Sequence, residues 1–338
     1  MHIFIDESGT FAGLDRDQPA ISTLGALIIP THVLPRLFKR YSRIRSTLPT
    51  RKGEVKGSLL KETQFIEIIE LLRKNGAIFC ASMIDMAEHR LSDIERHRSE
   101  GITALSRNLS NGHTPELRKN VAQLQDRMRL FSPQLYAQLM VTFDLLHRVM
   151  EEMIAYHSQR NPKELESFHW IVDAKQSDHV SDWEDWWSNT LVVWLQAMSL
   201  KRPGLLLKFG DYRHFQRFFH QDVPDYLSEH IKKDDPQRPA GVNLQLLFRE
   251  HFAFSSDPLP GLELVDIVTN GLRRALIGNL HETAWVRIRD LMINRREGCI
   301  RPVSLQFEDQ QSSRSYSEIL YKLRSGNRSM LTNANQGR

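Results

Sequence analysis

Short apolar runs alternate with amphipathic stretches at the start of the chain. His2–Ile5, Thr23–Ile29 and Ala77–Ile84 are rich in bulky and β-branched side chains and stop at polar or turn-forming residues, a pattern typical of buried strands. Between the second and third runs, apolar residues at helical spacing predict a basic helix around Leu37–Leu48 and a second helix over Glu62–Lys74. We expect the three strands to lie in one sheet with these helices packed against it.

The next segment has a helical pattern. From Met86 to Glu166 the apolar positions follow helical spacing, interrupted at Arg107–Arg118 by a stretch rich in Asn, Gly and Pro that is typical of a loop. Ser132 followed by Pro133 is a helix-start signal, because serine caps the first turn and proline is tolerated at its first position. This segment predicts a helical insertion into an α/β domain.

Strand patterns return in the second half of the chain. Phe168–Asp173, Leu205–Phe209 and Leu246–Phe254 are apolar runs of strand length. A further helix begins near Leu259 and ends at Gly278-Asn279, a typical stop signal. We expect these elements to complete the α/β domain.

A tryptophan-rich helix and a polar tail complete the predicted elements. Ser181 and Glu184 form a capping box, and the four tryptophans between Trp183 and Trp194 have the spacing of a core or interface stripe rather than a cofactor site. Beyond about Asp309 the composition predicts a mostly mobile tail with one short helix. The expected organisation is a first half-domain over residues 1–85, a helical insertion over 86–166, a second half-domain over 167–308 and a tail over 309–338.

Composition narrows the class of protein. Hydrophobic residues are 41% of the 338 and charged residues 25%, the proportions of a soluble globular protein. No stretch has the length and apolarity of a membrane span or signal peptide, so we expect no membrane association. Two isolated cysteines, Cys80 and Cys299, exclude a disulfide scaffold and a cysteine-zinc motif. They fit a reducing compartment, and we therefore expect a cytoplasmic location.

Positive charge is concentrated in one stretch. Between Arg36 and Lys61 there are nine basic residues and a single acid, Glu54, although the net charge of the chain is only +4. Such a block can bind a polyanion, or it can be the solvated face of an ordinary helix, and a packed helix can satisfy both descriptions. The candidate nucleic-acid contacts are Arg40, Arg43, Arg51, Lys52 and, beyond this stretch, Lys175.

Several acidic residues lie at the ends of predicted elements. Asp6 ends the first strand with Glu7 beside it, and Asp173 ends the strand over Phe168–Val172. An Asx-turn or helix cap would explain one such residue. However, α/β folds place their sites at the carboxyl ends of strands, and a buried carboxylate is costly unless a cation or hydrogen bonds compensate it. In an extended segment, Glu54 and Lys56 would point to the same side.

The late helix has a polar stripe. Glu263, Asp266, Asn270 and Arg273 are spaced three, four and three residues apart, which places them on one helical face opposite an apolar one. Taken alone, this pattern indicates a surface helix with its acids in water. When the acids at the strand ends are considered as well, the polar stripe can instead face the sheet and place a carboxylate near the end of a strand.

Converging carboxylates would favour a hard divalent cation. They would raise one another's pKa unless a cation lies among them, and oxygen ligands of this kind suit Mg²⁺ or Mn²⁺. Two such ions about 3.5–4 Å apart can activate a water and stabilise the leaving oxygen in phosphodiester cleavage. Lys56 could then stabilise the developing negative charge.

Four short motifs resemble those of one bacterial family. Ile5-Asp6-Glu7-Ser8-Gly9, Glu54-Val55-Lys56-Gly57-Ser58, the strand-ending Asp173 and Leu262-Glu263-Leu264-Val265-Asp266 resemble the domain-of-unknown-function family 3800, which is regarded as ribonuclease H-like. The motifs extend over most of the chain. The late motif usually reads apolar-Gln-Leu-Ala-Asp, so Glu263 and Val265 depart from it while Asp266 keeps its place.

The resemblance implies a fold and a site. The fold would be a ribonuclease H-like mixed sheet flanked by helices, an α/β class, with residues 1–85 and 167–308 as its two halves. The metal site would lie at Asp6, Asp173 and Asp266, with Glu54 or Glu263 as the fourth acid, and the substrate would be nucleic acid, either DNA or RNA. The candidate catalytic set is Asp6, Glu7, Glu54, Lys56, Asp173, Glu263 and Asp266.

Three functions are compatible with these patterns. The first is a metal-dependent nuclease, a hydrolase of bacterial defence or mobile-element context, with a protein partner or self-association as a further expectation. The second is a haloacid dehalogenase-like phosphatase, because Asp6-Glu7-Ser8-Gly9-Thr10 approaches that family's Asp-x-Asp-Gly-Thr pattern with Asp6 as nucleophile, and Gly210-Asp211 resembles its later Gly-Asp. The third is a non-catalytic subunit that binds nucleic acid or serves assembly.

Overall fold

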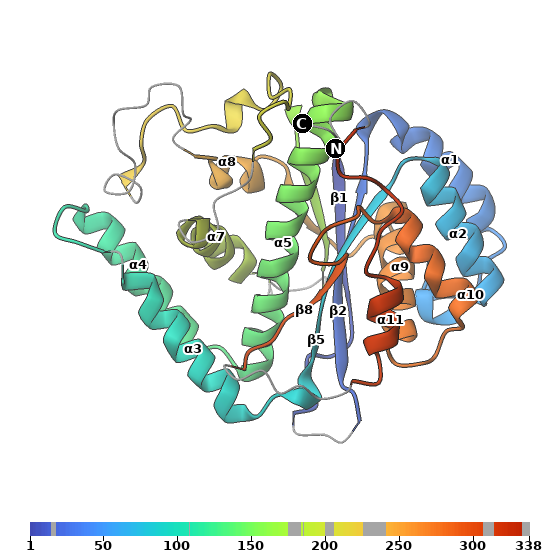
Figure 1. Ribbon diagram of the computed structural model, residues 1–338, viewed down its shortest axis with the longest axis horizontal. Coiled ribbons are helices and arrows are strands. Elements are labelled where there is room, and N and C mark those ends of the chain that lie inside the picture. The colour runs from blue at the N-terminus through green and yellow to red at the C-terminus, as the bar shows by residue number, and fades with distance from the viewer. Residues whose placement is uncertain are drawn as a thin grey trace.

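The described structure is a sheet between two helical layers. The computed structural model describes residues 1–14, 18–107, 109–174, 184, 186–199, 206–225, 241–306 and 314–332. Figure 1 shows the strands nearly edge-on, with α1, α2 and α9 on one side of the sheet and α5 and α7 on the other. The expected α/β class, a mixed sheet flanked by helices, is confirmed.

The sheet combines an antiparallel meander with parallel strands at both edges. Across the sheet the order is β7 (Phe252–Ser255), β6 (His169–Asp173), β1 (His2–Ser8), β2 (Ile21–Ile29), β5 (Ile78–Asp85) and β8 (Ile300–Pro302). Strands β1, β2 and β5 pair antiparallel in chain order. Strand β6 pairs parallel with β1 and β7 parallel with β6, while β8 adds to β5 in parallel. The second half of the chain therefore extends the sheet made by the first.

One helical layer covers the face that carries the candidate site. It contains α1 (Leu34–Arg45), α2 (Glu62–Lys74) and α9 (Pro260–Leu276), with the short α10 (Glu282–Trp285) and α11 (Ser317–Lys322) beside them. The apolar stripes of these helices and the apolar side chains on this face of β2 and β5 form one buried core. Helix α11 matches the short helix that we predict in the tail.

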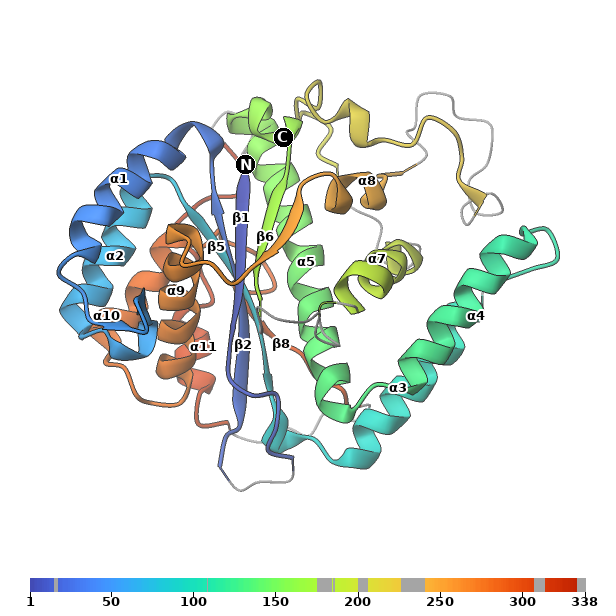
Figure 2. The ribbon, with the colours of Figure 1, turned by 180° about the vertical axis from the view of Figure 1, so that it is seen from behind.

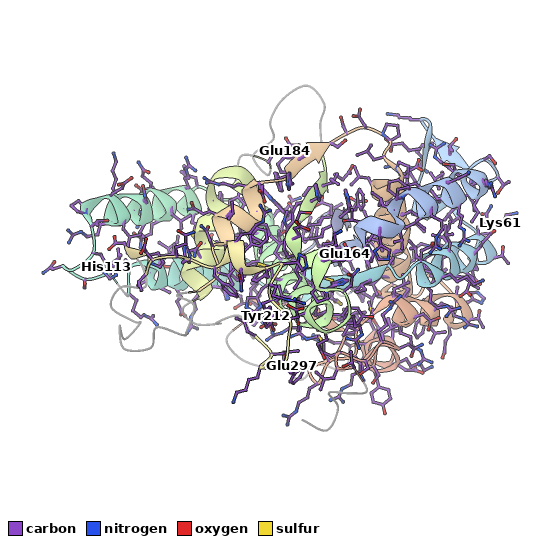
Figure 3. The ribbon with its side chains drawn as sticks, turned by 90° about the horizontal axis from the view of Figure 1, so that it is seen from above. Lys61, His113, Glu164, Glu184, Tyr212 and Glu297 are labelled. Carbon is purple, nitrogen blue, oxygen red and sulfur yellow. The ribbon has the colours of Figure 1, made fainter. Side chains whose placement is uncertain are left out.

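The opposite face is covered mainly by a long helix. Helix α5 (Pro133–Arg160) packs on β2 and β5, and it begins where the Ser132 hydroxyl accepts a hydrogen bond from the amide of Leu135. The predicted helical segment over 86–166 thus includes the helix that covers this face. Its other two helices, α3 (Leu91–Ser106) and α4 (Pro115–Arg129), form an arm whose tip carries His113, far from Lys61 across the molecule (Figure 3).

Some local predictions are wrong. The described part of the predicted strand over Leu205–Phe209, residues 206–209, lies in a loop, and the predicted strand over Leu246–Phe254 is helix α8 (Leu244–Arg249) followed by β7. Asn243 explains the helix, because its side chain accepts a hydrogen bond from the amide of Leu246 as an N-cap. The predicted loop over Arg107–Arg118 ends early, since Thr114 caps α4.

The tryptophan-rich segment is described only in part. Trp186, Trp187 and Trp194 are buried, as a core stripe requires. Helix α7 (Val192–Ser199) lies in this segment. Ser181 and Trp183 lie outside the described residues.

Helix α9 approaches β2 so closely that it requires a glycine there. A Cβ on Gly25 would overlap the hydroxyl of Thr269 and lie 2.7 Å from the ring of Phe79.

Replacing Gly25 by alanine should therefore destabilise the protein. Gly25→Ala should lower the free energy of unfolding, measured by urea denaturation, by roughly 1–3 kcal/mol, the usual cost of overpacking. Gly101→Ala in α3 is the control, because the nearest neighbour of the added Cβ, the Tyr136 hydroxyl, is 3.3 Å away. Equal stability of the two variants would contradict this packing.

Candidate active site

Asp6 and Asp173 lie side by side on neighbouring parallel strands. Ile5 pairs with Val172, so the next residues, Asp6 and Asp173, follow in the same register. Side chains alternate along a strand, which places Asp6 on the same face as Phe4, toward α9. Asp6 is only 8% exposed, and Asp173 is half-buried.

Helix α9 brings a third acid to the same place. Asp266 accepts a hydrogen bond from the amide of Gly57 at 2.6 Å. Its carboxyl group also lies close enough to that of Asp6 for its charge to raise the pKa of Asp6. The predicted convergence of acids from β1, β6 and α9 is therefore present in the structure.

A small hairpin contributes Glu54 and Lys56. Strands β3 (Thr50–Arg51) and β4 (Glu54–Val55) are joined by Lys52 and Gly53, whose φ angles of 54° and 85° are those of a tight type I′ turn. Lys56 Nζ lies 2.7 Å from Glu54 Oε2, and the charge of Lys56 acts on both Asp173 and Asp266. The hairpin thus holds one carboxylate and one ammonium group at the cluster.

Glu263 fastens this hairpin to α9. Its buried carboxylate accepts hydrogen bonds from the Tyr41 hydroxyl at 2.9 Å and from the amide of Val55 at 2.9 Å. Arg45 donates from Nε and Nη2, both at 2.7 Å, and Nη2 also donates to the carbonyl of Gly53. The carboxylate of Glu263 is therefore occupied by anchoring contacts, whereas that of Glu54 faces the cluster.

The other predicted residues lie on the opposite face of the sheet, on the exposed surface of α1 and the hairpin, or outside the described part. Glu7 points to the opposite face of the sheet, where Gln138 of α5 donates a hydrogen bond to it. Lys175 lies outside the described residues. The remaining predicted contacts are exposed on α1 and the hairpin: Arg40, Arg43, Arg51 and Lys52.

Anchoring residues are the part of the site that the sequence does not reveal. Tyr41 and Arg45 have the spacing of an ordinary amphipathic helix, and their role appears only when α1, β4 and α9 meet at Glu263. The later residues of the polar stripe on α9 also form hydrogen bonds to distant segments of the chain. Asn270 donates to the Ser8 hydroxyl at 3.2 Å, and Arg273 donates to the carbonyl of Ile21 at 2.8 Å. The stripe therefore faces the sheet and hairpin rather than water.

Burial raises the pKa of all three aspartates, and the charge of at least one neighbouring carboxylate adds to each rise. The pKa of Asp6 is well above its ordinary value because of burial and the charges of Asp173 and Asp266. Burial raises the pKa of Asp173 to about 6, with Lys56 opposing the rise and Glu54 adding to it. Burial also raises the pKa of Asp266, although the amide of Gly57 and Lys56 oppose it. The protein's own groups therefore compensate the negative charge of this cluster only in part.

The donor set fits a hard divalent cation. Among the described residues, no group of three or more His, Cys, Asp or Glu side chains is positioned to hold a metal ion as it stands. However, carboxylate oxygens of Asp6, Asp173 and Asp266 are the ligand type that Mg²⁺ and Mn²⁺ prefer, and the raised pKa values of these groups indicate negative charge that the protein compensates only in part. These three residues, with Glu54 beside them, would hold such an ion.

Comparisons with protein-family models, with curated proteins and with solved structures found no match for this chain. None of the helices in the described ranges has the length and apolarity needed to cross a bilayer.

The raised pKa of Asp173 predicts how stability depends on pH without metal. The folded protein keeps a proton on Asp173 up to about pH 6, whereas the unfolded chain releases it near pH 3.8, so stability is lost as pH rises through this window. Asp173→Asn should therefore raise the free energy of unfolding at pH 7, by up to about 3 kcal/mol. The gain should vanish at pH 4.

Chemical denaturation in a chelating buffer at both pH values measures this effect. Asp222→Asn is the control, because Asp222 is exposed. A stabilisation that is the same at pH 4 and pH 7 would show that ionisation of Asp173 is not its cause.

Proposed function

We propose that this protein is a metal-dependent nuclease that hydrolyses phosphodiester bonds in nucleic acid. The observation that carries the proposal is the convergence of Asp6, Asp173 and Asp266, from two strands and a helix, into one largely buried cluster of carboxyl groups whose pKa values are raised. Buried like charges are costly to a fold, and such an arrangement is typical of sites that bind a cation. Mg²⁺ or Mn²⁺ would activate water and stabilise the leaving oxygen when bound.

The protein's own groups would position the substrate. Lys56, held by Glu54, supplies a positive charge beside the acids and would bind the scissile phosphate and stabilise the negative charge that develops on it. Glu263 would act indirectly, by fixing the hairpin that carries both residues. Glu54 is therefore the better candidate for the fourth acid.

The strand arrangement supports a ribonuclease H-like fold within this proposal. An antiparallel meander of β1, β2 and β5 is extended beside β1 by the parallel strands β6 and β7. Asp6 and Asp173 lie on the neighbouring parallel strands β1 and β6, and Asp266 lies on α9, which covers this face. This agrees with the motifs through which the chain resembles family 3800, and membership in that family is part of the proposal.

A basic surface adjoins the cluster. Between Arg36 and Lys61, seven basic residues are exposed on α1, the hairpin and the start of α2, and within the described chain no carboxylate pairs with any of them. They are Arg36, Lys39, Arg40, Arg43, Arg51, Lys52 and Lys61. Glu54, the one acid of the stretch, is paired with Lys56. Uncompensated positive charge along a helix is what a phosphate backbone binds.

The phosphatase alternative receives less support. Gly210-Asp211 would have to approach Asp6, yet the amide of Asp211 bonds to Ser158, near the end of α5. Glu7, next to Asp6, contacts Gln138 near the start of α5, and the two contacts are about 30 Å apart along the helix. Asp211 is paired with Arg213 instead. The non-catalytic alternative predicts binding without cleavage, which the following experiment distinguishes.

Asp6→Asn should abolish Mn²⁺-dependent cleavage of nucleic acid. Loss of outer partners of a metal site commonly costs 10–100-fold, so loss of a ligand should cost at least about 100-fold. Gel assays with labelled DNA and RNA measure the rate, and Asp211→Asn is the matched control. Metal-dependent cleavage that survives Asp6→Asn would exclude this site.

Metal binding can be measured independently of catalytic activity. Mn²⁺ should raise the Tm of the wild-type protein and leave that of Asp6→Asn almost unchanged, because only the folded site binds the ion. A protein that binds nucleic acid but shows neither cleavage nor this Tm shift would favour the non-catalytic alternative.

Removing positive charge from α1 and the hairpin should weaken binding to nucleic acid. Replacing Arg40, Arg43 and Arg51 by Ala should lower the slope of log affinity against log salt by about 1 to 3, because fewer counterions are released. Fluorescence anisotropy across a salt series measures the slope. The control replaces Lys119, Arg127 and Arg129 on α4, which removes the same charge from the arm. Equal slopes in the two variants would show that the basic residues of α1 and the hairpin are solvent-exposed without contacting the phosphates.

A further inference from the structure

The face of the sheet that carries the acids is only partly covered. Phe4 of β1 is buried under Phe38 of α1 and Gly261 of α9. Farther toward the edge, however, His251 and Ala253 on the same face are exposed. Figure 2 shows β6 beside β1, with the chain from β7 crossing to α9 in front. A strip of open sheet surface thus borders the cluster.

Three histidines form a stack on this strip. His2 and His169 are register partners on β1 and β6, and the pairing of Trp170 with Phe252 places His169 beside His251. The ring centroids are 4.5 Å and 4.4 Å apart, and the ring planes differ by only 12° and 13°. His251, the outermost, is exposed. The stack therefore ends in an aromatic face open to solvent at the edge of the sheet.

The stack and the acids share one face along the same strands. His169 and Asp173 are four residues apart on β6, which places them on the same side and about 13 Å apart at 3.3 Å per residue. About four nucleotides at the duplex spacing of 3.4 Å would bridge this distance, and fewer if the strand is extended. The stack is therefore within reach of a strand bound at the cluster.

Helix α1 runs beside this path. It begins shortly after Ile29, the partner of His2, and it ends at Arg45, which bonds to the hairpin at Gly53. Its exposed Arg36 and Arg40 therefore lie between the level of the histidines and that of the acids. A phosphate backbone that follows α1 would therefore pass from the histidines to the acidic cluster.

The inner rings of the stack are uncharged at physiological pH. Burial and the neighbouring His169 and N-terminus lower the pKa of His2 to about 4, and Glu164, which binds that N-terminus and His32, only partly opposes this. Burial and His251 also lower the pKa of His169. Neutral imidazoles offer stacking surfaces rather than positive charge.

We infer that His2, His169 and His251 form a base-stacking platform that binds a single strand of nucleic acid and directs it to the acidic cluster. This inference rests on the proposed nuclease function. A base on the open face of His251 would continue the stack, and protein aromatic rings, histidine among them, bind unpaired bases in this way. Bases within a duplex are already stacked on one another and cannot occupy that place. The platform therefore selects single strands.

The test measures binding of labelled oligonucleotides by anisotropy in a chelating buffer. The probes are a 12-nucleotide single strand, as DNA and as RNA, and the corresponding duplexes. His251→Ala should weaken single-strand binding about fivefold to tenfold, a typical loss for one stacked base, with no change of salt slope because the contact that is lost is to a base and not to a phosphate. His251→Phe should restore affinity. His281→Ala, at an exposed histidine beside α2, should have no effect.

The outcomes separate this inference from the nuclease proposal. Unchanged single-strand affinity in His251→Ala, or a wild-type preference for duplex, overturns the platform while Mn²⁺ binding and Asp6-dependent cleavage still support the nuclease. Failure to bind either form of nucleic acid, together with no Mn²⁺-induced rise in Tm, overturns both. A reduced affinity that His251→Phe does not restore assigns the effect to local structure and also overturns the platform.

Discussion

The repulsion between the buried Asp6 and the half-buried Asp173 and Asp266 is the constraint on which the rest of this structure depends. Asp6 has little contact with water, and its neighbours Asp173 and Asp266 are carboxylates too. The fold compensates this with the amide of Gly57, which donates a hydrogen bond to Asp266, and with the ammonium group of Lys56. Each compensating group reaches the cluster only because α9 lies directly on the sheet.

Close packing of α9 is therefore a condition for the site as well as for the core. Small residues at the contact allow it, most clearly Gly25 beneath Thr269 and Gly261 against Phe4. The same helix anchors the hairpin through Glu263, one turn before Asp266. Because β1 and the hairpin come from the first 85 residues and β6 and α9 from the second half, the site forms only when the two halves meet.

Two kinds of surface adjoin the cluster, and they would serve different purposes. The basic residues of α1 and the hairpin supply charge that does not distinguish one sequence or strand form from another. The histidine stack is mostly uncharged and offers ring faces instead. In the proposed nuclease, the basic surface would determine how strongly nucleic acid binds. The histidine stack would determine whether a single strand or a duplex reaches the acids.

The sequence by itself determined the local elements and the chemical character of the site. Strand and helix periodicity located β1, β2, β5, β6 and α2 closely, and Ser132 marked the start of α5, because these signals depend on neighbours within a few residues. Acids at predicted strand ends pointed to Asp6 and Asp173, although β1 continues past Asp6 to Ser8 because Glu7 and Ser8 still pair with β2. Only the tertiary structure decided the strand order, the helix at Leu244–Arg249, the anchoring role of Glu263 and the alignment of His2, His169 and His251. These depend on register and packing between segments far apart in the chain, which local periodicity does not encode.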